Sequence, residues 1–171
     1  SRYYLGVVKR QTGDLPGAVD DLRAAIKIDP RLAAAHVQLG AALQAWGDLD
    51  GAIAAFERAV ALDATRADAA SSLGLALMQK GEAARAVATL REAVARHPDH
   101  GTARLNLGTA LLQSGEVGGA MDVYRGLIDG EPANAEAWYD LGLALKQKDD
   151  FAGAEPAFRT ALRLDAAMAE A

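Results

Sequence analysis

The chain has 171 residues, of which 51% are apolar and 24% charged, and its formal net charge is −5. This weak negative charge argues against the dense cationic surface that nucleic-acid binding needs, and no apolar run approaches the roughly 20 residues that span a bilayer. The absence of cysteine excludes disulfides and thiolate metal sites. Abundant alanine and few aromatic residues favour helices over strands.

The most regular feature of the sequence is a Leu-Gly pair that returns every 34 residues. The five pairs are Leu5-Gly6, Leu39-Gly40, Leu73-Gly74, Leu107-Gly108 and Leu141-Gly142. An alanine and, four residues later, a large residue keep the same period: Ala18 and Leu22, Ala52 and Phe56, Ala86 and Leu90, Ala120 and Tyr124, Ala154 and Phe158. A period of this length indicates stacked units that bury their apolar faces against one another.

In chain order, the units span residues 1–32, 33–66, 67–100, 101–134 and 135–168. The first unit lacks its first two positions, and residues 169–171 spell the opening of a further unit. We therefore expect a single array excised from a longer protein that continues at least on the C-terminal side. Because the chain begins inside a unit, the absence of a leader carries no weight, and the cytoplasm is only the default compartment.

Within each unit, apolar residues fall on two helical stripes. In the second unit, Ala35, Leu39 and Leu43 mark the first stripe, and Ala52 and Phe56 mark the second. A glycine suited to positive φ follows the first stripe in four units, at Gly13, Gly47, Gly81 and Gly115, and Asp149 replaces it in the fifth. Each unit is therefore predicted to be a hairpin of two helices.

An acidic residue comes directly after this turn position in every unit. The five residues are Asp14, Asp48, Glu82, Glu116 and Asp150. A carboxylate there is expected to cap the second helix or to face its positive end. The second helix of the fourth unit contains Gly118, Gly119, Gly126 and Gly130. Because interior glycines weaken a helix, we predict that this helix exchanges its amides fastest among the internal ones.

These residues resemble the tetratricopeptide repeat, whose pattern combines Trp, Leu-Gly and Tyr with a later Ala, Phe and Pro. The fifth unit matches best, with Trp138, Leu141-Gly142, Ala154 and Phe158. The tryptophan slot departs from the pattern in the other units, at Arg2, His36, Ala70 and Arg104. The resemblance covers nearly the whole chain. It implies an all-α, right-handed superhelical solenoid of antiparallel helix pairs, with first helices lining a concave groove.

The resemblance also implies which positions of each unit face that groove. The candidate partner-binding residues are Tyr3, Arg10, Gln11, Gln44, Ser71, Met78, Gln79, Asn106, Thr109, Gln113, Tyr139, Lys146 and Gln147. Glutamine stands at the thirteenth position in four units, and its amide both donates to and accepts from a peptide backbone. The alternative is that these glutamines only solvate the turn. Tyr139 is the best anchor, because an aromatic ring with a polar tip is favoured at binding sites.

Several specialised sites of the family are absent from this sequence. The basic and amide residues of the carboxylate clamp are missing, since a clamp starting in the second unit meets Val37 and Ala41. The asparagine ladder of repeats attached to sugar-transferring enzymes survives only at Asn106. The run from His97 to His100 offers too few ligands for a metal. With no nucleophile–base pair or phosphate loop, we expect no catalytic residue and no cofactor.

The sequence therefore predicts a protein-interaction scaffold that binds a protein or peptide of unknown identity, without nucleic acid or membrane insertion. One alternative is a recruiting arm of a larger enzyme, such as a glycosyltransferase. Another is a self-assembling scaffold joined through array ends, because Phe158, Leu162 and Leu164 leave an uncapped apolar face. Trp46 either covers the turn beside Leu49 or contacts a partner.

Overall fold

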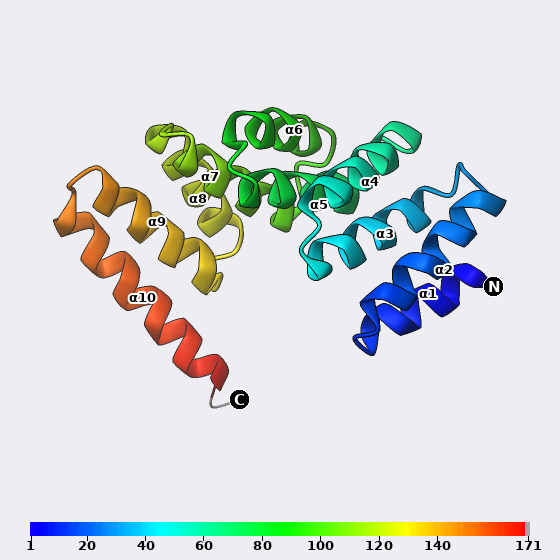
Figure 1. Ribbon diagram of the computed structural model, residues 1–171. Coiled ribbons are helices and arrows are strands. Elements are labelled where there is room, and N and C mark those ends of the chain that lie inside the picture. The colour runs from blue at the N-terminus through cyan, green and yellow to red at the C-terminus, as the bar shows by residue number, and fades with distance from the viewer. Residues whose placement is uncertain (170–171) are drawn as a thin grey trace. The chain divides into compact units, whose positions relative to one another are not determined.

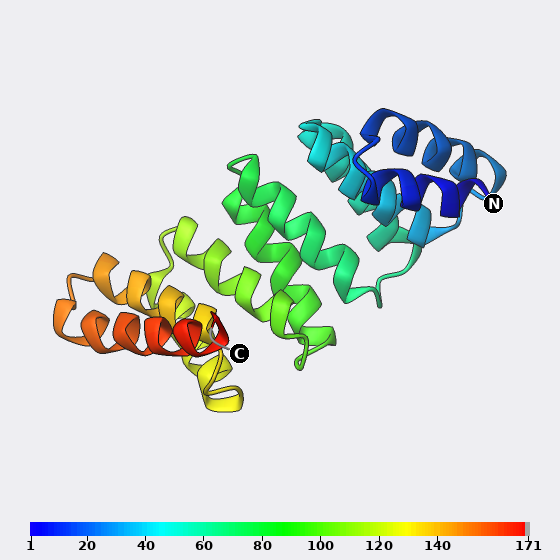
Figure 2. The ribbon, with the colours of Figure 1, turned by 90° about the horizontal axis from the view of Figure 1, so that it is seen from below.

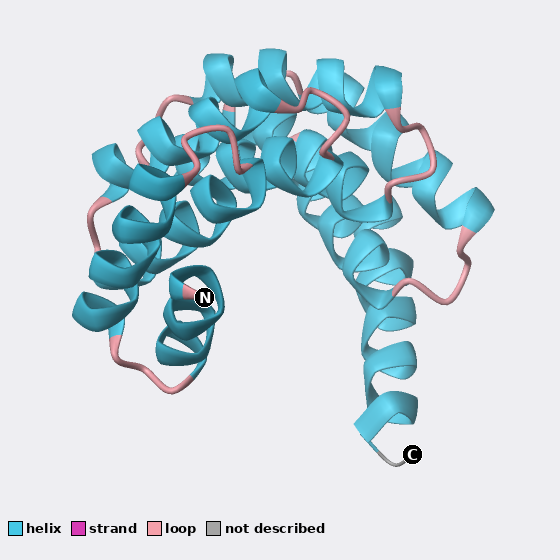
Figure 3. Ribbon diagram, turned by 90° about the vertical axis from the view of Figure 1, so that its right-hand side faces the viewer, coloured by secondary structure: helices cyan, strands magenta, loops and turns pink. Residues whose placement is uncertain are grey.

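The computed structural model describes residues 1–169, with only the backbone for 167–169, and contains ten α-helices and no strand there (Figure 3). The all-α prediction is confirmed. None of the described helices is long and apolar enough to cross a membrane. The sequence predicts that residues 169–171 begin a further unit. Residues 170 and 171 of this segment lie outside the described residues.

The chain divides into two compact units, Ser1–Glu82 and Ala83–Ala171 (Figure 1). The first unit contains α1 (Arg2–Gln11), α2 (Leu15–Ile28), α3 (Ala33–Trp46), α4 (Leu49–Leu62) and α5 (Ala67–Gln79). The second unit contains α6 (Ala83–Arg96), α7 (Gly101–Gln113), α8 (Val117–Gly130), α9 (Ala135–Gln147) and α10 (Phe151–Ala169).

Within each unit, every helix packs on the helix that follows it. Three second helices consequently pack against two first helices each: α2 against α1 and α3, α4 against α3 and α5, and α8 against α7 and α9. Figure 2 shows the last pair, α9 and α10, side by side. Adjacent first helices also touch, which places α1, α3 and α5 side by side in the first unit, and α7 beside α9 in the second. The first helices therefore form one continuous layer in each unit.

In four hairpins, α1–α2, α3–α4, α7–α8 and α9–α10, the repeated glycine lies in close contact with the repeated large side chain. Phe56 and Tyr124 are among the largest fully buried residues. A Cβ added to Gly40 would lie 2.6 Å from the Phe56 ring, and one added to Gly108 would lie 2.4 Å from the Tyr124 ring. Only glycine lets the two helices approach this closely, which explains the 34-residue spacing of the Leu-Gly pairs.

The turn inside each hairpin also follows the sequence pattern. Gly13, Gly47, Gly81 and Gly115 all have φ between 84° and 90°, and Asp149 adopts φ 61° in their place. The aspartates that follow cap the second helices: Asp14, Asp48 and Asp150 each accept a hydrogen bond from a backbone N–H three residues on, at 2.9–3.0 Å. This part of the cap prediction is confirmed.

Glu116 stands at the N-cap position of α8, beside the positive end of the helix, but makes no side-chain hydrogen bond to it. Its carboxylate instead binds Arg91, with 2.7 Å between Nη2 and Oε2. A glutamate side chain is one methylene longer than aspartate and is a poorer N-cap, so it reaches the cation of the neighbouring helix instead. Helix α8 therefore begins without the side-chain cap that α2 and α4 have.

Helix α10 is longer than the other second helices. It continues to Ala169, whereas α2, α4, α6 and α8 end at the positions equivalent to Leu164. The segment that continues it is rich in alanine and contains no proline, so nothing interrupts the helix there. Pro156 is the sixth residue of α10, beyond the first turn, and the helix continues through it.

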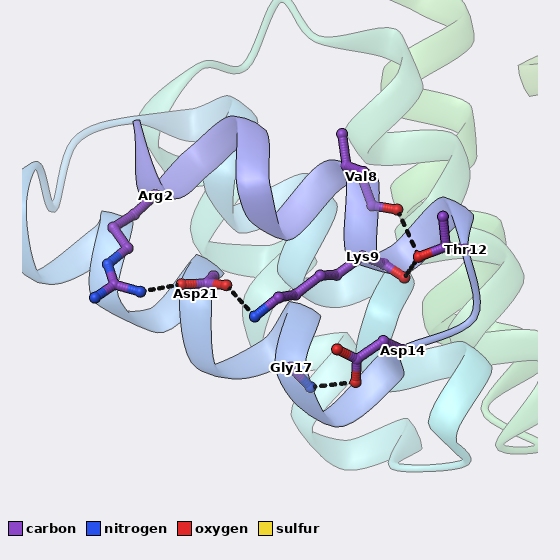
Figure 4. Close-up of polar contacts among 7 residues, drawn as sticks. All are labelled: Arg2, Val8, Lys9, Thr12, Asp14, Gly17 and Asp21. Carbon is purple, nitrogen blue, oxygen red and sulfur yellow. Dashed lines mark hydrogen bonds and ion pairs between the residues drawn. The ribbon is translucent and has the colours of Figure 1, made fainter.

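A buried carboxylate fixes α1 on α2 (Figure 4). Asp21 is only 3% exposed, yet Arg2 Nη1 lies 2.5 Å from its Oδ1 and Lys9 Nζ lies 2.6 Å from its Oδ2. These hydrogen-bonded cations, Lys9 before Arg2, hold the pKa of Asp21 below its usual range. The two ends of α1 are thereby tied to a single point of α2.

Candidate functional site

In the first unit, the candidate residues lie on the layer formed by α1, α3 and α5. Tyr3, Arg10 and Gln44 are half-buried, and Gln11 and Gln79 are exposed. All five come from first helices that touch their neighbours, so their side chains share one layer. The structure thus supplies a surface to which three successive repeats contribute.

Two hydrogen bonds join neighbouring first helices across this layer. Arg10 Nε donates to Gln38 Oε1 at 3.1 Å, and Gln44 Nε2 donates to Gln79 Oε1 at 2.7 Å. Each amide can make more bonds than the one that joins the pair. The Gln44 carbonyl remains an acceptor and the Gln79 amino group remains a donor, which together match the N–H and C=O of a peptide backbone.

In the second unit, the candidate residues lie on α7 and α9. Gln113, Lys146 and Gln147 are exposed. Asn106 and Thr109 are half-buried, and the Thr109 hydroxyl lies 3.3 Å from the Tyr124 hydroxyl. The exposed members provide a surface of amides and one cation.

Tyr139 is the exposed aromatic residue of this surface, with 51% of its side chain accessible. Its ring packs at 5.6 Å, centroid to centroid, against the ring of Phe158 on α10. The contact holds the tyrosine ring in place while half of it stays open to solvent. Tyr139 therefore has the geometry of an anchor for a partner side chain.

Two predicted site residues on α5 are not accessible. Ser71 is 5% exposed and Met78 is 7% exposed. Eight of the 13 residues of α5 are buried, so this helix exposes fewer side chains to solvent than the repeat positions imply. On α5 the accessible surface consists of Gln79 together with Leu75, which is 40% exposed.

Helix α9 also carries a pair of acidic residues one turn apart. Glu136 is exposed and Asp140 is half-buried. Burial, and secondarily the negative charge of Glu136, raise the pKa of Asp140 to about 6. Asp140 is not among the residues that the repeat pattern indicates as binding residues; the signal that could have found it is the i, i+4 spacing of two carboxylates on one helix face.

A hollow of about 810 Å³ opens between α9 and α10. Its lining combines apolar side chains with carboxylates at the edge: Ala133, Asn134, Ala135, Glu136, Tyr139, Phe158, Ala161, Leu162 and Asp165. Leu162 is 70% exposed, and Phe158 and Leu164 are half-buried. The apolar face that the sequence predicted on the last helix is therefore present.

The remaining candidates do not form a site. His100 Nδ1 accepts a hydrogen bond from the Ala103 N–H at 3.1 Å and so caps α7. The described part of the chain holds no group of three or more side chains that could bind a metal. Trp46, the last residue of α3, is 53% exposed, so about half of its side chain is free to contact a partner.

Comparison with protein families gives matches along almost the whole chain. Residues 71–134 and 135–167 match families described as "Tetratricopeptide repeat". Residues 6–47 and 45–81 match one described as "TPR repeat". No curated protein matches the chain.

Solved structures share the fold over nearly the full length. A crystal structure of MamA is 29% identical, with a TM-score of 0.87 and 97% of each chain covered. A second MamA crystal structure is 28% identical, with a TM-score of 0.85, and covers 99% of this chain and 92% of its own. YrrB, described as a TPR protein with an unusual peptide-binding site, is 20% identical, with a TM-score of 0.79 and coverage of 95% and 84%.

Proposed function

Because the chain belongs to the tetratricopeptide-repeat family, we propose that it is a protein-interaction module that binds an extended segment of a partner along the exposed faces of its first helices. The observation that carries this proposal is the Gln44–Gln79 pair, which joins two first helices and still presents an acceptor and a donor. Such a pair recognises a peptide backbone without requiring a particular sequence.

A pre-ordered surface favours binding of this kind. The amides are fixed on adjacent helices, and the Tyr139 ring is packed against Phe158. Little side-chain freedom is then lost when the segment binds, which reduces the entropic cost of association. The chain supplies no chemistry to the bound segment in this proposal; it holds the segment in place.

The same surface would serve if the chain were the recruiting arm of a larger enzyme. YrrB contributes only its fold to the argument, since its likeness to this chain is at 20% identity. The proposal for this chain therefore rests on its own amides and on Tyr139. The experiment below tests the surface directly.

The test is capture of partners from the source proteome on the immobilised chain, followed by mass spectrometry. Gln79→Ala removes an exposed first-helix side chain of the first unit, and Gln113→Ala and Tyr139→Ala each remove one of the second unit. A variant in the unit that holds the segment should reduce capture of that partner by about tenfold, which corresponds to roughly 1.4 kcal/mol. Circular dichroism should show unchanged helix content, because all three side chains are exposed.

Arg23→Ala on α2 and Arg125→Ala on α8 are the controls, because both side chains are exposed on second helices. Capture should be unaffected by them. If the two arginine variants lose the partner and the three first-helix variants retain it, the binding surface lies on the second helices and the proposal is wrong.

A further inference from the structure

Arg10 is a half-buried cation on the layer of first helices in the first unit. Its Nε donates to the Gln38 side-chain oxygen at 3.1 Å, which ties the guanidinium to the junction between α1 and α3. Among the residues that the structure describes, no carboxylate lies within ion-pair distance of Arg10. A guanidinium has five N–H donors, so those on Nη1 and Nη2 remain available after the bond to Gln38.

The other cations near this layer already have carboxylate partners. Arg2 and Lys9 both bind Asp21 on α2 (Figure 4). Arg66, the residue before α5, binds Asp68 through two hydrogen bonds, with 3.1 Å between Nε and Oδ1 and 2.6 Å between Nη2 and Oδ2. Arg66 thus shows how a guanidinium of this unit holds a carboxylate, and Arg10 has the same group without the partner.

The repeat pattern places Arg10 on the side of α1 that faces the following repeat. Gln44 stands 34 residues after Arg10, at the same position of α3. It is half-buried as Arg10 is, although α1 and α2 both contact its helix. Its hydrogen bond also runs forward to the next first helix, to Gln79 on α5. The partial exposure of Arg10 is therefore a property of this repeat position and does not depend on what precedes α1.

We propose that the segment bound by the first unit carries an aspartate or glutamate side chain that binds Arg10. This inference rests on the proposed function, because it assigns a side chain to the segment whose backbone binds the Gln44–Gln79 pair. The carboxylate would accept hydrogen bonds from Nη1 and Nη2 together, since Nε is held by Gln38. Two parallel bonds of this kind recognise the planar shape of a carboxylate as well as its charge.

The surroundings of Arg10 match a side chain with one negative charge. Neither α3 nor α5 contains a lysine or an arginine, so these helices supply no second cation beside Arg10. A phosphate group carries about −1.5 to −2 charges at neutral pH and is held best by several cations. The residues of the family's clamp for a carboxy-terminal group are absent, with Val37 and Ala41 at two of their positions. An internal acidic side chain is the group that a single guanidinium fits.

Helix geometry predicts where this acidic residue stands in the segment. Gln38 and Gln44 are six residues apart on α3, which is about 9 Å along the helix axis. The Arg10–Gln38 bond lies on the α1 side of α3 and the Gln44–Gln79 bond on the α5 side, which adds about 9 Å across the layer. The two contact points are then about 13 Å apart, or about four residues of an extended segment. Ala41 lies between the two glutamines on α3, and its small side chain lets the segment pass.

The test begins with selection of random peptides, displayed without a free carboxy terminus, on the immobilised 171-residue chain. Peptides whose binding Gln79→Ala weakens are kept, because these bind the first unit. They should be enriched in Asp or Glu. One such peptide is then made with both ends capped, together with its Glu→Gln analogue (Asp→Asn if the residue is aspartate), and fluorescence anisotropy measures the affinity of each.

The unmodified chain should bind the acidic peptide about five- to tenfold more tightly than the neutral analogue, because the bidentate ion pair is lost in the analogue. Arg10→Gln should bind the two peptides within about twofold of each other, since the guanidinium is absent. Arg10→Glu is the second variant, and it should bind a Lys analogue more tightly than the acidic peptide.

Arg58→Gln on α4 is the matched control, because it removes the same charge from an exposed second-helix position of the same unit. It should discriminate between the peptides as the unmodified chain does, and circular dichroism checks the fold of every variant. The inference is overturned, and the proposed function is kept, if first-unit peptides bind without any preference for the acidic side chain. It is also overturned if Arg58→Gln loses the preference as Arg10→Gln does, which indicates net charge alone.

A neutral peptide with a free carboxy terminus distinguishes the other source of a carboxylate. If it binds as tightly as the capped acidic peptide and loses this affinity in Arg10→Gln, the ligand of Arg10 is a chain end and the inference is wrong. Recovery of no peptide by the first unit would overturn this inference together with the binding of an extended segment there.

Discussion

At the scale of single residues, Asp21 is the group whose charge state most directly holds two helices together. Its pKa is lowered because Lys9 and Arg2 bind the charged carboxylate in the folded chain. Such a group stabilises the fold above its unfolded pKa of about 3.9, and this contribution is lost as the pH falls through the folded pKa. Acid should therefore loosen α1 from α2.

We expect Asp21→Asn to unfold at a lower urea concentration than the unmodified chain at pH 7. The difference between the two should shrink as the pH falls below about 4, because the natural carboxyl then becomes neutral as well. Urea titrations of both proteins from pH 3 to pH 7 measure this difference. A difference that does not change with pH would mean that the ion pairs to Arg2 and Lys9 contribute nothing.

Asp140 gives the stability of the fold the opposite dependence on pH. Its pKa is raised to about 6 by burial and by Glu136, so the folded chain binds its proton more tightly than the unfolded chain. The contribution of Asp140 to stability is therefore fully present below about pH 4, and it is lost as the pH rises from about 4 past 6. At neutral pH the charged carboxylate of Asp140 therefore destabilises the fold.

Asp140→Asn should raise Tm at pH 7.5 by about 2–4 °C, which corresponds to roughly 1 kcal/mol after allowance for the solvent that reaches this half-buried group. It should leave Tm at pH 4 unchanged. Scanning calorimetry measures both values, and Asp122→Asn on the exposed face of α8 is the control. Equal changes in Tm at pH 4 and pH 7.5 would contradict the raised pKa of Asp140.

At the scale of the helix pair, the repeated glycine is a steric requirement whose strength differs between repeats. A Cβ at Gly108 meets Tyr124, which is fully buried, whereas a Cβ at Gly142 meets Phe158 at 2.7 Å, beside the open hollow. Alanine gains about 1 kcal/mol over glycine inside a helix, and overpacking costs about 1–3 kcal/mol. The net effect of alanine depends on whether the aromatic ring can move away from the added Cβ.

We expect Gly108→Ala to lower the free energy of unfolding by about 1–2 kcal/mol, and Gly142→Ala to change it by less than about 0.5 kcal/mol. Urea denaturation measures the free energy of unfolding of both variants. Equal losses in the two variants would show that Phe158 is as constrained as Tyr124.

Helix α8 should be the weakest internal helix. It contains four glycines, and Gly118 and Gly130 have no atom within 4 Å of where a Cβ would stand. It also lacks the side-chain cap that α2 and α4 have. We expect its amides to exchange faster than those of α7 and α9, and Gly118→Ala to slow them while adding about 0.5–1 kcal/mol of stability. Hydrogen exchange read by NMR checks this, and faster exchange in α7 would contradict it.

The elements were largely predictable because one pattern is repeated with little change. The positive-φ glycines, the aspartate caps and the glycine contacts in the core all follow directly from residue type and spacing. Whether Glu116 caps α8 or only faces its end was not predictable, because its carboxylate binds Arg91 of a different repeat. The extension of α10 past Leu164 was missed because the repeat register implied a turn where the local composition favours helix.

At the scale of the whole chain, each helix in either unit is supported by its neighbours along the sequence. Stability in such a chain is close to a sum of repeat and interface contributions. The sequence identified the helices that carry the candidate surface, but it did not separate Ser71 and Met78, which are buried, from Gln79, which is exposed. Periodicity specifies a helix face, whereas accessibility depends on the side chains packed beside it.

The central claim is that the first helices keep a face free for a partner while the second helices are occupied with packing. The most direct measurement is the change in backbone amide NMR shifts when a synthetic peptide, corresponding to the segment captured from the proteome, is added. The account predicts the largest changes around Gln79, Gln113 and Tyr139. Changes concentrated on α2, α4, α6 and α8, with the first helices unaffected, would contradict it.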